Sequence, residues 1–385
     1  MKISHLFRDF FNSEKVGGVV LLFCTLISLV LANSTFGSDY HHFWMHPVFG
    51  HPIEYWINDG LMTVFFLLIG LELEREIYQG ELANLKDALF PIFAAIGGML
   101  VPAGIYLFFN WGTMTQSGAG IPMATDIAFA LGILALVGNK VPLSLKIFLT
   151  ALAVIDDLGA ILVIALFYTK TLYWLNLFIA LSLFIVLFVL GKYFKVRNLM
   201  PYLIGGVAMW YFMLQSGIHA TISGVLLAFA IPFGNGEKKA TSYILQHALH
   251  KPVAFVLLPI FALANTALVL NGSLDDVFTS TFSLGIALGL ILGKPIGIVL
   301  FTYMAVKFKY CRLPQGLNWK TIFGVGLLGG IGFTMSIFIT LLAFEDQNVI
   351  IKSKLIIMLA SLLAGLMGFF YLKIALKSKS EDTIE

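Results

Sequence analysis

The chain has 385 residues, of which 59% are hydrophobic and 12% are charged, and its mean hydropathy is +0.92. A soluble domain does not need so much apolar sequence to build a core, so the composition predicts an all-α polytopic membrane protein. The formal net charge of +3 is too small to indicate a nucleic-acid partner. Cys24 lies in an apolar run and Cys311 in a basic loop, so the cysteines indicate no disulfide framework.

Apolar runs that could cross a bilayer recur along the whole chain. A transmembrane helix needs about 20 predominantly apolar residues, and the pattern predicts about twelve such helices. Two short runs meet at Gly217 with almost no loop between them. The runs lie near residues 16–33, 57–74, 87–110, 118–138, 146–169, 174–191, 199–217, 218–232, 245–270, 281–306, 320–343 and 350–372.

Basic residues are distributed unevenly between the connections. Of the 24 Lys and Arg residues, one alternate set of connections carries all except Lys170, Lys352 and Lys354, which fall in the other set, and Lys294, which lies within a span. By the positive-inside rule, this asymmetry places both termini in the cytoplasm and favours an even number of spans.

The longest outer connection, residues 33–58, contains His41, His42, His46 and His51. Histidine is a common zinc ligand, but no carboxylate or cysteine accompanies these residues at a tight spacing. We therefore favour an ordered surface loop over a metal site.

Two predicted spans are interrupted at mid-length. One has Pro122 and two glycines in GAGIPMATDIAFA, and the other has five glycines in GVGLLGGIGFTMSIF. Glycine-mediated helix packing explains either segment alone. Residues 87–169 and 281–372, however, each hold three predicted spans with the interrupted one in the middle. An odd number of spans separates the starts of the two units, so the pattern predicts two inverted three-helix repeats whose broken helices cross at mid-membrane.

Three carboxylates, Asp126, Asp156 and Asp157, lie within this apolar sequence. Each Asp at the centre of a membrane helix costs about 2.5–3.5 kcal/mol on insertion scales. Neighbouring helices can satisfy one such group as a structural polar residue, but an adjacent pair with a third acid indicates an ion or proton path. Lys294 is the only basic residue near the middle of a predicted span, so we expect it to be the counter-charge rather than a lysine that extends to the headgroups.

Breaking a helix at mid-membrane leaves unpaired N–H groups on one half and unpaired C=O groups on the other, with about half a unit of charge at each end. We expect the half-helix beginning near Met123 to point its positive end at Asp126 and the hydroxyl of Thr125. Thr334 and Ser336 offer similar hydroxyls at the second break.

Carboxylates, hydroxyls and backbone carbonyls form an oxygen-only site, which suits a hard cation rather than a soft transition metal. Asp156 and Asp157 point about 100° apart on a helix, so one can hold an ion while the other meets a counter-charge. Burial and a neighbouring carboxylate both favour protonation of a carboxyl group. Sodium and protons would then compete for the same group, and that competition is antiport.

Several long segments also resemble one known family. The sequence is similar to the NhaA-type sodium/proton antiporters over essentially its whole length, in NDGLMTVFFLLIGLELERE, TDIAFALG, AVIDDLGA, SGIHAT, GKPIGI and IGFTMSIF. That family is itself an established example of inverted repeats, so the repeat pattern and the resemblance are not independent.

The resemblance implies an electrogenic, pH-regulated Na+(Li+)/H+ antiporter that exports sodium from the cytoplasm by alternating access and needs no cofactor. Asp157 corresponds to the main cation ligand. Asp156 either joins it around the sodium ion or pairs with Lys294, which serves as counter-charge or proton carrier. Asp126 and Thr125 lie at the crossing of the broken helices and tune the site.

Other positions correspond to residues linked to pH regulation. Glu72, Arg75 and Glu76 match a cluster in a cytoplasmic funnel, although they also fit an ordinary charged helix end. Asp59 matches an acid near the outer end of the second span. His219 matches a position connected with the pH profile and equally fits a hydrogen-bonded histidine at a helix end.

The chain departs from the family pattern at Gln246, in LQHALHKP, where the family has an acidic residue. The family's account of pH activation therefore does not transfer directly to this chain. The family also forms homodimers through an outer hairpin, which implies that role for residues 33–58. The expected setting is the bacterial inner membrane, with sodium, protons and lipid as partners.

Three other classes compete with this interpretation. A sodium-coupled symporter of similar fold is the main alternative. An intramembrane aspartyl protease would place its two acids on separate helices to share a proton, which the adjacent pair does not fit, so we expect no enzyme. A passive cation channel would need a ring or filter built from several copies.

Overall fold

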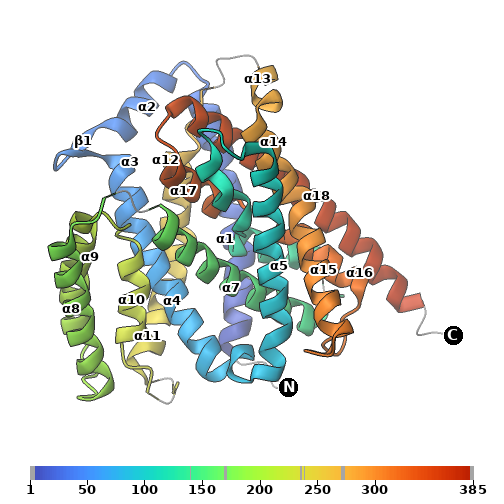
Figure 1. The fold of residues 1–385 in the computed structure, drawn as a ribbon, viewed down its shortest axis with the longest axis horizontal. Helices are drawn as coiled ribbons and strands as arrows, with labels where there is room; N and C mark the ends of the chain where they lie inside the picture. The colour runs from blue at the N-terminus through green and yellow to red at the C-terminus, as the bar shows by residue number, and fades with distance from the viewer. Residues whose placement is uncertain are drawn as a thin grey trace. The chain divides into compact units, whose positions relative to one another are not determined.

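The computed structural model describes residues 5–138, 140–168, 171–234, 236–237, 239–269 and 274–381. Lys170 lies outside these residues. Both ends of the chain, which were predicted above to be cytoplasmic, also lie outside them. The described elements are α1 (His5–Ala32), α2 (Gly37–Met45), β1 (Pro47–Val48), β2 (His51–Pro52), α3 (Ile53–Trp56), η1 (Ile57–Leu61), α4 (Met62–Gln79), η2 (Glu81–Ala83), α5 (Leu85–Asn110), η3 (Gln116–Met123), α6 (Ile127–Val137), α7 (Leu143–Phe167), α8 (Trp174–Lys192), α9 (Met200–Ser216), α10 (Ile222–Ala230), α11 (Thr241–Pro252), η4 (Val253–Leu257), α12 (Leu258–Asn265), α13 (Leu274–Thr279), α14 (Thr281–Leu288), η5 (Gly289–Gly293), α15 (Lys294–Lys307), α16 (Trp319–Gly329), α17 (Phe333–Ala343) and α18 (Gln347–Glu381) (Figure 1).

Within the described residues, eight helical stretches are long and apolar enough to cross a membrane, or up to ten if each of two bent pairs is one span. One pair is residues 16–32 with α2, bent by 114°, and the other is α16 with α17, bent by 48°. Two expected spans are shorter than 18 residues, because α9 has 17 residues and α10 has 9. The structure therefore supports an all-α polytopic membrane protein, while the count of twelve spans and the inverted repeat stay predictions.

The chain divides into two compact units. Unit 1 comprises residues 1–23, 84–160 and 268–385 and contains both interrupted segments. In this unit α5 packs along α15, α15 contacts α16, and α16 contacts α18 (Figure 1). A capping box fixes the start of α16, because the N–H of Thr321 donates to Asn318 Oδ1 at 2.8 Å and the N–H of Asn318 donates to Thr321 Oγ1 at 3.0 Å.

Glycine allows α5 and α15 to approach each other closely. A Cβ at Gly97 would meet the carbonyl oxygen of Gly297, and a Cβ at Gly297 would meet that of Gly97, both closer than real Cβ atoms come. Because lipid tails are as apolar as leucine, close packing of this kind supplies much of the attraction between membrane helices.

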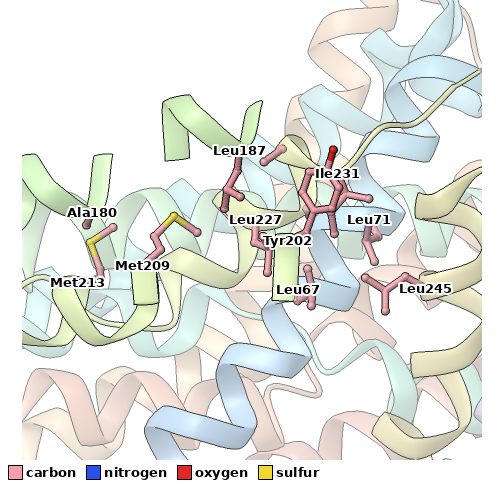
Figure 2. Close-up of a cluster of buried hydrophobic side chains, with 12 residues drawn as sticks. Leu67, Leu71, Ala180, Leu187, Tyr202, Met209, Met213, Leu227, Ile231 and Leu245 are labelled. Atoms are coloured by element: carbon pink, nitrogen blue, oxygen red, sulfur yellow. The ribbon is translucent and has the colours of Figure 1, made fainter. Parts of the chain in front are cut away.

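Unit 2 comprises residues 24–83 and 161–267, with α4 packed against α10 and α8 packed against α9 and α10. Its apolar cluster is shown in Figure 2 and includes Leu67, Leu71, Leu187 and Leu227 around Tyr202. The Tyr202 hydroxyl donates to the carbonyl of residue 196 at 2.9 Å, so the polar end of this buried ring is satisfied.

The outer connection of residues 33–58 contains α2 and a short antiparallel hairpin in which Val48 pairs with His51. The His51 ring stacks on Tyr55 with 4.2 Å between ring centroids, and Trp56 Nε1 donates to the Val48 carbonyl at 2.8 Å. No group of three or more His, Cys, Asp and Glu side chains among the described residues is placed to hold a metal. Aromatic and backbone contacts thus order this segment.

The close contact between α5 and α15 generates a prediction about stability. Gly297→Ala forces a Cβ against the α5 backbone, and overpacking of this kind costs about 1–3 kcal/mol. Gly104→Ala is the matched control, because a Cβ there meets nothing within 4 Å and alanine is the better helix former. Thermal unfolding of the detergent-purified proteins should show a lower midpoint for Gly297→Ala alone. Equal midpoints for the two variants would show that the helices do not approach this closely.

Candidate functional site at the crossing of two interrupted helices

The two interrupted segments of unit 1 cross and bond to each other through their backbones. After η3 the chain is extended at residues 124–126, and the N–H of Asp126 donates to the carbonyl of Ile331 at 2.6 Å. Ile331 lies in the break between α16 and α17. The half-helix α6 begins at Ile127, so the expectation that it starts near Met123 was wrong. Residues Gln116–Met123 instead form the 3₁₀ segment η3. The α-helix starts only at Ile127 because Asp126 has an extended backbone and is its N-cap.

One carboxylate serves the N-termini of two half-helices. Asp126 Oδ1 accepts from the N–H of Phe129 in α6 at 3.0 Å. Asp126 Oδ2 accepts from the N–H of Thr334 in α17 at 3.1 Å and from the Thr334 hydroxyl at 2.5 Å. Each N-terminus carries about half a unit of positive charge, so together they match one carboxylate. Asp126 is only 2% exposed, and this match is what makes its burial tolerable.

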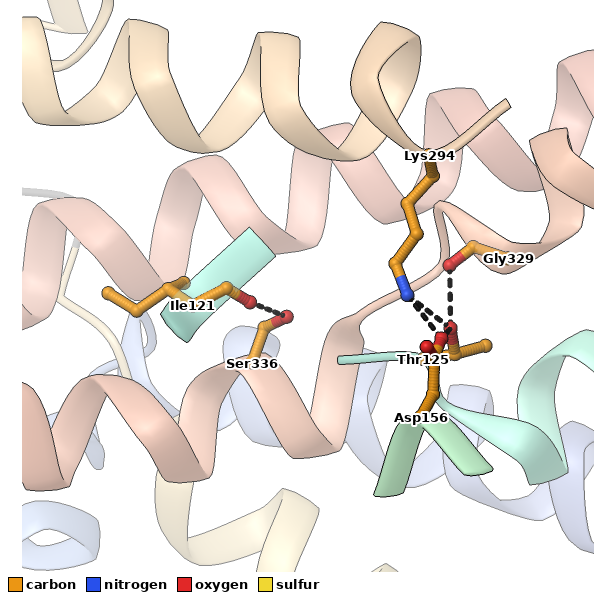
Figure 3. A network of polar contacts seen from close by, with 6 residues as sticks. All are labelled: Ile121, Thr125, Asp156, Lys294, Gly329 and Ser336. Carbon is orange, nitrogen blue, oxygen red and sulfur yellow. Dashed lines mark hydrogen bonds and ion pairs between the residues drawn. The ribbon is translucent and has the colours of Figure 1, made fainter. Parts of the chain in front are cut away.

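Two hydroxyls serve the carbonyl ends on the other sides of the breaks. Ser336 Oγ donates to the carbonyl of Ile121 in η3 at 2.7 Å (Figure 3). Thr125 Oγ1 lies 3.0 Å from the carbonyl of Gly329, the last residue of α16, and 2.8 Å from Asp156 Oδ2. The Thr125 hydroxyl therefore faces the C-terminus of α16, whereas the sequence placed it at the positive end of the first half-helix.

Lys294 extends from the start of α15 toward the same point (Figure 3). Its Nζ donates to Thr125 Oγ1 at 2.8 Å and forms an ion pair with Asp156 Oδ2. Neither Lys294 nor Asp156 is exposed to any extent. Because Thr125 accepts from the ammonium, its single hydroxyl proton is directed to Asp156 or to the Gly329 carbonyl.

Asp157 is the exception in this network. It is fully buried, and neither of its carboxylate oxygens has a hydrogen-bond partner in the described part of the chain. It interacts electrostatically with Asp156, Asp126 and Lys294, so it belongs to the same site. A buried carboxylate without donors is strongly disfavoured unless it binds a proton or a cation.

The sequence singled out Lys294 as the one lysine near the middle of a predicted span. The structure shows a second buried lysine in a helix that could span a membrane. The candidate span of residues 347–377 in α18 also contains Lys354, which is 5% exposed. The sequence assigned Lys354 to an outer connection, although the predicted span of residues 350–372 begins before it; in the structure α18 begins at Gln347 and Lys354 is buried.

The residues linked above to pH regulation lie in unit 2 rather than at this site. Arg75 Nη1 donates to Gln246 Oε1 at 3.1 Å, and its guanidinium lies over the Tyr243 ring at 4.9 Å from the centroid. Glu72 and Glu76 interact electrostatically with the same guanidinium. The structure thus assembles α4 and α11 around one arginine.

His219 and Asp59 occupy separate places in unit 2. His219 lies between α9 and α10, where its Nε2 is 3.2 Å from the carbonyl of Tyr168. Asp59 lies in the π-helical turn η1, and its backbone carbonyl accepts from the Thr63 hydroxyl at 2.5 Å.

Sequence reasoning missed Ser361 of α18. Its Oγ accepts from the N–H groups of Gly332 and Phe333, at 3.2 and 3.1 Å, so it caps the N-terminus of α17. A single serine within an apolar helix carries no distinctive pattern. Only the expectation that every N–H group at a break needs an acceptor could have pointed to it.

Interrupted helices that cross in an apolar interior, with three buried carboxylates and a buried lysine, define a membrane protein of the ion-translocating class. Residues 8–372 match the family described as Na+/H+ antiporter 1. The chain is 66% identical to the Na(+)/H(+) antiporter NhaA of Flavobacterium psychrophilum, with 98% of each chain covered. It is 61% identical to NhaA 1 of Flavobacterium johnsoniae, over 97% of this chain and 98% of the relative. It is 48% identical to NhaA of Vibrio cholerae, over 98% and 100%.

The chain belongs to the Na+/H+ antiporter 1 family. This membership confirms the resemblance found in the sequence, and all three of these relatives are named as antiporters rather than enzymes.

The Lys294–Asp156 pair generates a second prediction. Lys294→Ala leaves a buried carboxylate without its counter-charge, which costs about 3–5 kcal/mol. The double variant Asp156→Asn with Lys294→Gln removes both charges and should recover most of the lost thermal stability. Lys320→Ala, at an exposed lysine near the start of α16, is the control for loss of a lysine. A midpoint for Lys294→Ala equal to that of the parent would show that the pair does not stabilise the fold.

Proposed function

We propose that this protein exchanges cytoplasmic Na+ or Li+ for protons across the bacterial inner membrane by alternating access, with Asp157 as the group for which the ions compete. The observation that carries the proposal is the fully buried Asp157 carboxylate, whose oxygens have no hydrogen-bond partner in the described residues. Membership of the Na+/H+ antiporter 1 family supports the same activity.

The charges around the site explain why Asp157 carries the exchange. Lys294 neutralises Asp156, and the two half-helix N-termini neutralise Asp126. Asp157 has no such partner, so a proton or a monovalent cation must balance its charge whenever the site is closed to water. A proton and a sodium ion cannot both satisfy the same oxygens, and binding of one therefore releases the other.

The ligands available to sodium are oxygen atoms, as a hard cation requires. Asp157 would supply carboxylate oxygens. Asp156 Oδ1 is also buried without a hydrogen-bond partner among the described residues, and it can join them while Oδ2 stays with Lys294. The backbone at residues 124 and 125 can supply carbonyl oxygens, because it is outside any helix, whereas the Asp126 carbonyl already accepts from the N–H of Ala130.

The crossing also suits alternating access. Its backbone ends are satisfied by side chains, namely Asp126, Ser361, Ser336 and Thr125, rather than by continuous helix hydrogen bonds. Side-chain bonds of this kind can adjust when the ion is exchanged, whereas a continuous helix cannot bend without losing its own bonds. We infer that small shifts at the crossing open the site to one side of the membrane at a time.

The transported charge depends on what Lys294 does. If Lys294 releases a proton when sodium binds, exchange is electrogenic through this pair. If it remains a structural counter-ion, its removal leaves the charge moved per sodium unchanged. The Asp156→Asn/Lys294→Gln double variant separates these roles. The charge moved per sodium should fall in this variant only if Lys294 releases a proton in the parent.

We further propose that the arginine cluster of Glu72, Arg75 and Glu76, with His219 and Asp59, regulates the exchange by pH. Their support is that all five lie in unit 2, with Glu72, Arg75 and Glu76 together on α4 and His219 near the carbonyl of Tyr168, together with the family membership. A homodimer formed through the hairpin of residues 33–58 and embedded in lipid is part of the same proposal.

The exchange proposal predicts the behaviour of Asp157→Asn. The amide keeps the size of the side chain but cannot release a proton, so sodium-driven proton movement should fall to background while the protein still inserts. Dequenching of a pH-sensitive dye in inside-out vesicles with Na+, Li+ or K+ measures this. Asp346→Asn, at an exposed acid before α18, should behave as the parent.

Two outcomes of that assay contradict the proposal. Full exchange by Asp157→Asn would assign the competition to another group. A requirement for an organic solute before the parent moves sodium would indicate the symporter instead.

The arginine cluster generates a prediction for Gln246→Glu. The new carboxylate would lie beside the Arg75 guanidinium, which now holds the Gln246 amide. We expect the pH profile of exchange to move by about half a unit, the shift that an interaction of about 0.7 kcal/mol gives. Gln215→Glu adds the same charge at an exposed position of α9 and should leave the profile in place. Coincident profiles for the parent and Gln246→Glu would show that α11 is not coupled to exchange.

A further inference from the structure

The N-terminus of α17 presents three successive N–H groups at the break, on Gly332, Phe333 and Thr334. Ser361 Oγ accepts from the first two, and Asp126 Oδ2 accepts from the third. A neutral hydroxyl from α18 and a charged carboxylate from the other broken segment thus divide the same helix end between them. Without Ser361, these two N–H groups would lose the acceptor that they have in the structure.

Close packing holds Ser361 in this position. The side chain is 5% exposed. A Cβ at Gly330 would lie 3.2 Å from the Cβ of Ala364, and a Cβ at Gly365 would lie 3.5 Å from Cδ1 of Ile331. Small residues one turn after the serine therefore keep α18 in contact with the break, and the hydroxyl has little freedom to leave.

We propose that Ser361 is a positioning residue for cation binding, which acts by sharing the N-terminus of α17 with Asp126 and so keeps the Asp126 carboxylate from being drawn fully onto that helix. Asp126 directly follows Thr125, whose hydroxyl lies 2.8 Å from Oδ2 of Asp156, the neighbour of Asp157 in α7, so the placement of Asp126 changes the field at the proposed ligand. The inference rests on the proposed sodium/proton exchange, because it assigns Ser361 to that same site.

The physical consequence concerns affinity rather than turnover. When the Ser361 hydroxyl is removed, the two N–H groups at residues 332 and 333 lose their acceptor, and the positive end of α17 then draws more strongly on the Asp126 carboxylate that already accepts from Thr334. The negative charge of Asp126 is then held at the N-terminus of α17 and attracts a cation less strongly. Sodium binding should weaken, while the steps that depend on Asp157 and Lys294 remain intact.

The test compares four variants of the full-length protein. Ser361→Ala removes the hydroxyl, Ser361→Cys keeps the approximate volume but offers a poor acceptor, and Ser361→Thr keeps the hydroxyl. Ser353→Ala is the matched control on the same helix, because Ser353 is fully buried and its Oγ has no hydrogen-bond partner in the described part of the chain. The same substitution there removes a buried hydroxyl without touching the break.

Two readouts are needed for each variant. The first is the half-saturating sodium concentration and the maximal rate of exchange in inside-out vesicles, and the second is binding of radioactive sodium to the purified protein. We expect about a tenfold rise in half-saturating sodium for Ser361→Ala, the change that an altered hydrogen bond to a charged group gives. Ser361→Cys should follow Ser361→Ala in direction, with a nearly unchanged maximal rate. Ser361→Thr and Ser353→Ala should stay with the parent.

Each outcome has a separate meaning. Unchanged sodium dependence in Ser361→Ala or in Ser361→Cys, with the parent active, overturns the role of Ser361. Equal losses in Ser361→Ala and Ser353→Ala overturn it as well, since they indicate a general packing effect. A parent that binds no sodium and exchanges none defeats the proposed function itself, whatever the variants do.

Discussion

Two helix N-termini that point at one place repel each other, and the Asp126 carboxylate is what allows α6 and α17 to meet. Its two oxygens accept from Phe129 in one half-helix and from Thr334 in the other. In a water-poor interior neither end could stay unpaired, so the crossing exists only because an anion lies between the two positive ends. The extended backbone, the hydroxyl contacts and the approach of Lys294 are all built around this junction.

This junction also divides the work among the three acids. Asp126 is committed to the helix ends, and Asp156 is committed through one oxygen to Lys294. Asp157 lies next to them with no such commitment in the described residues. The expense of burying three carboxylates is therefore offset for two of them by fixed partners, and the third is left for an exchangeable one. Transport chemistry needs this inequality, because three satisfied acids would bind nothing and three unsatisfied acids would not fold.

Much of this site could be predicted from the sequence, because the cost of membrane carboxylates makes Asp126, Asp156, Asp157 and Lys294 conspicuous. Glycines likewise indicated both breaks, together with Pro122 at the first one. The exact bonding could not be predicted, because it depends on which backbone groups the fold brings together.

Thr125 is one example, since its hydroxyl lies against the Gly329 carbonyl at the end of α16 rather than at the N-terminus of α6. Ser361 is another, since a lone serine among apolar residues has no pattern. Lys354 was assigned to an outer connection because it lies near the start of a predicted span, and only the structure shows that it is buried. A hydropathy profile identifies spans from their composition, so it does not detect where a helix continues into polar sequence.

The central claim is that sodium displaces a proton from Asp157, while Asp156 is occupied by Lys294. Calorimetric titration of the purified protein with sodium, repeated in buffers of different ionisation enthalpy, counts the protons released on binding. The Asp156→Asn/Lys294→Gln double variant should still bind sodium with proton release, whereas Asp157→Asn should release no proton. Proton release that persists in Asp157→Asn and disappears in the double variant would contradict the claim.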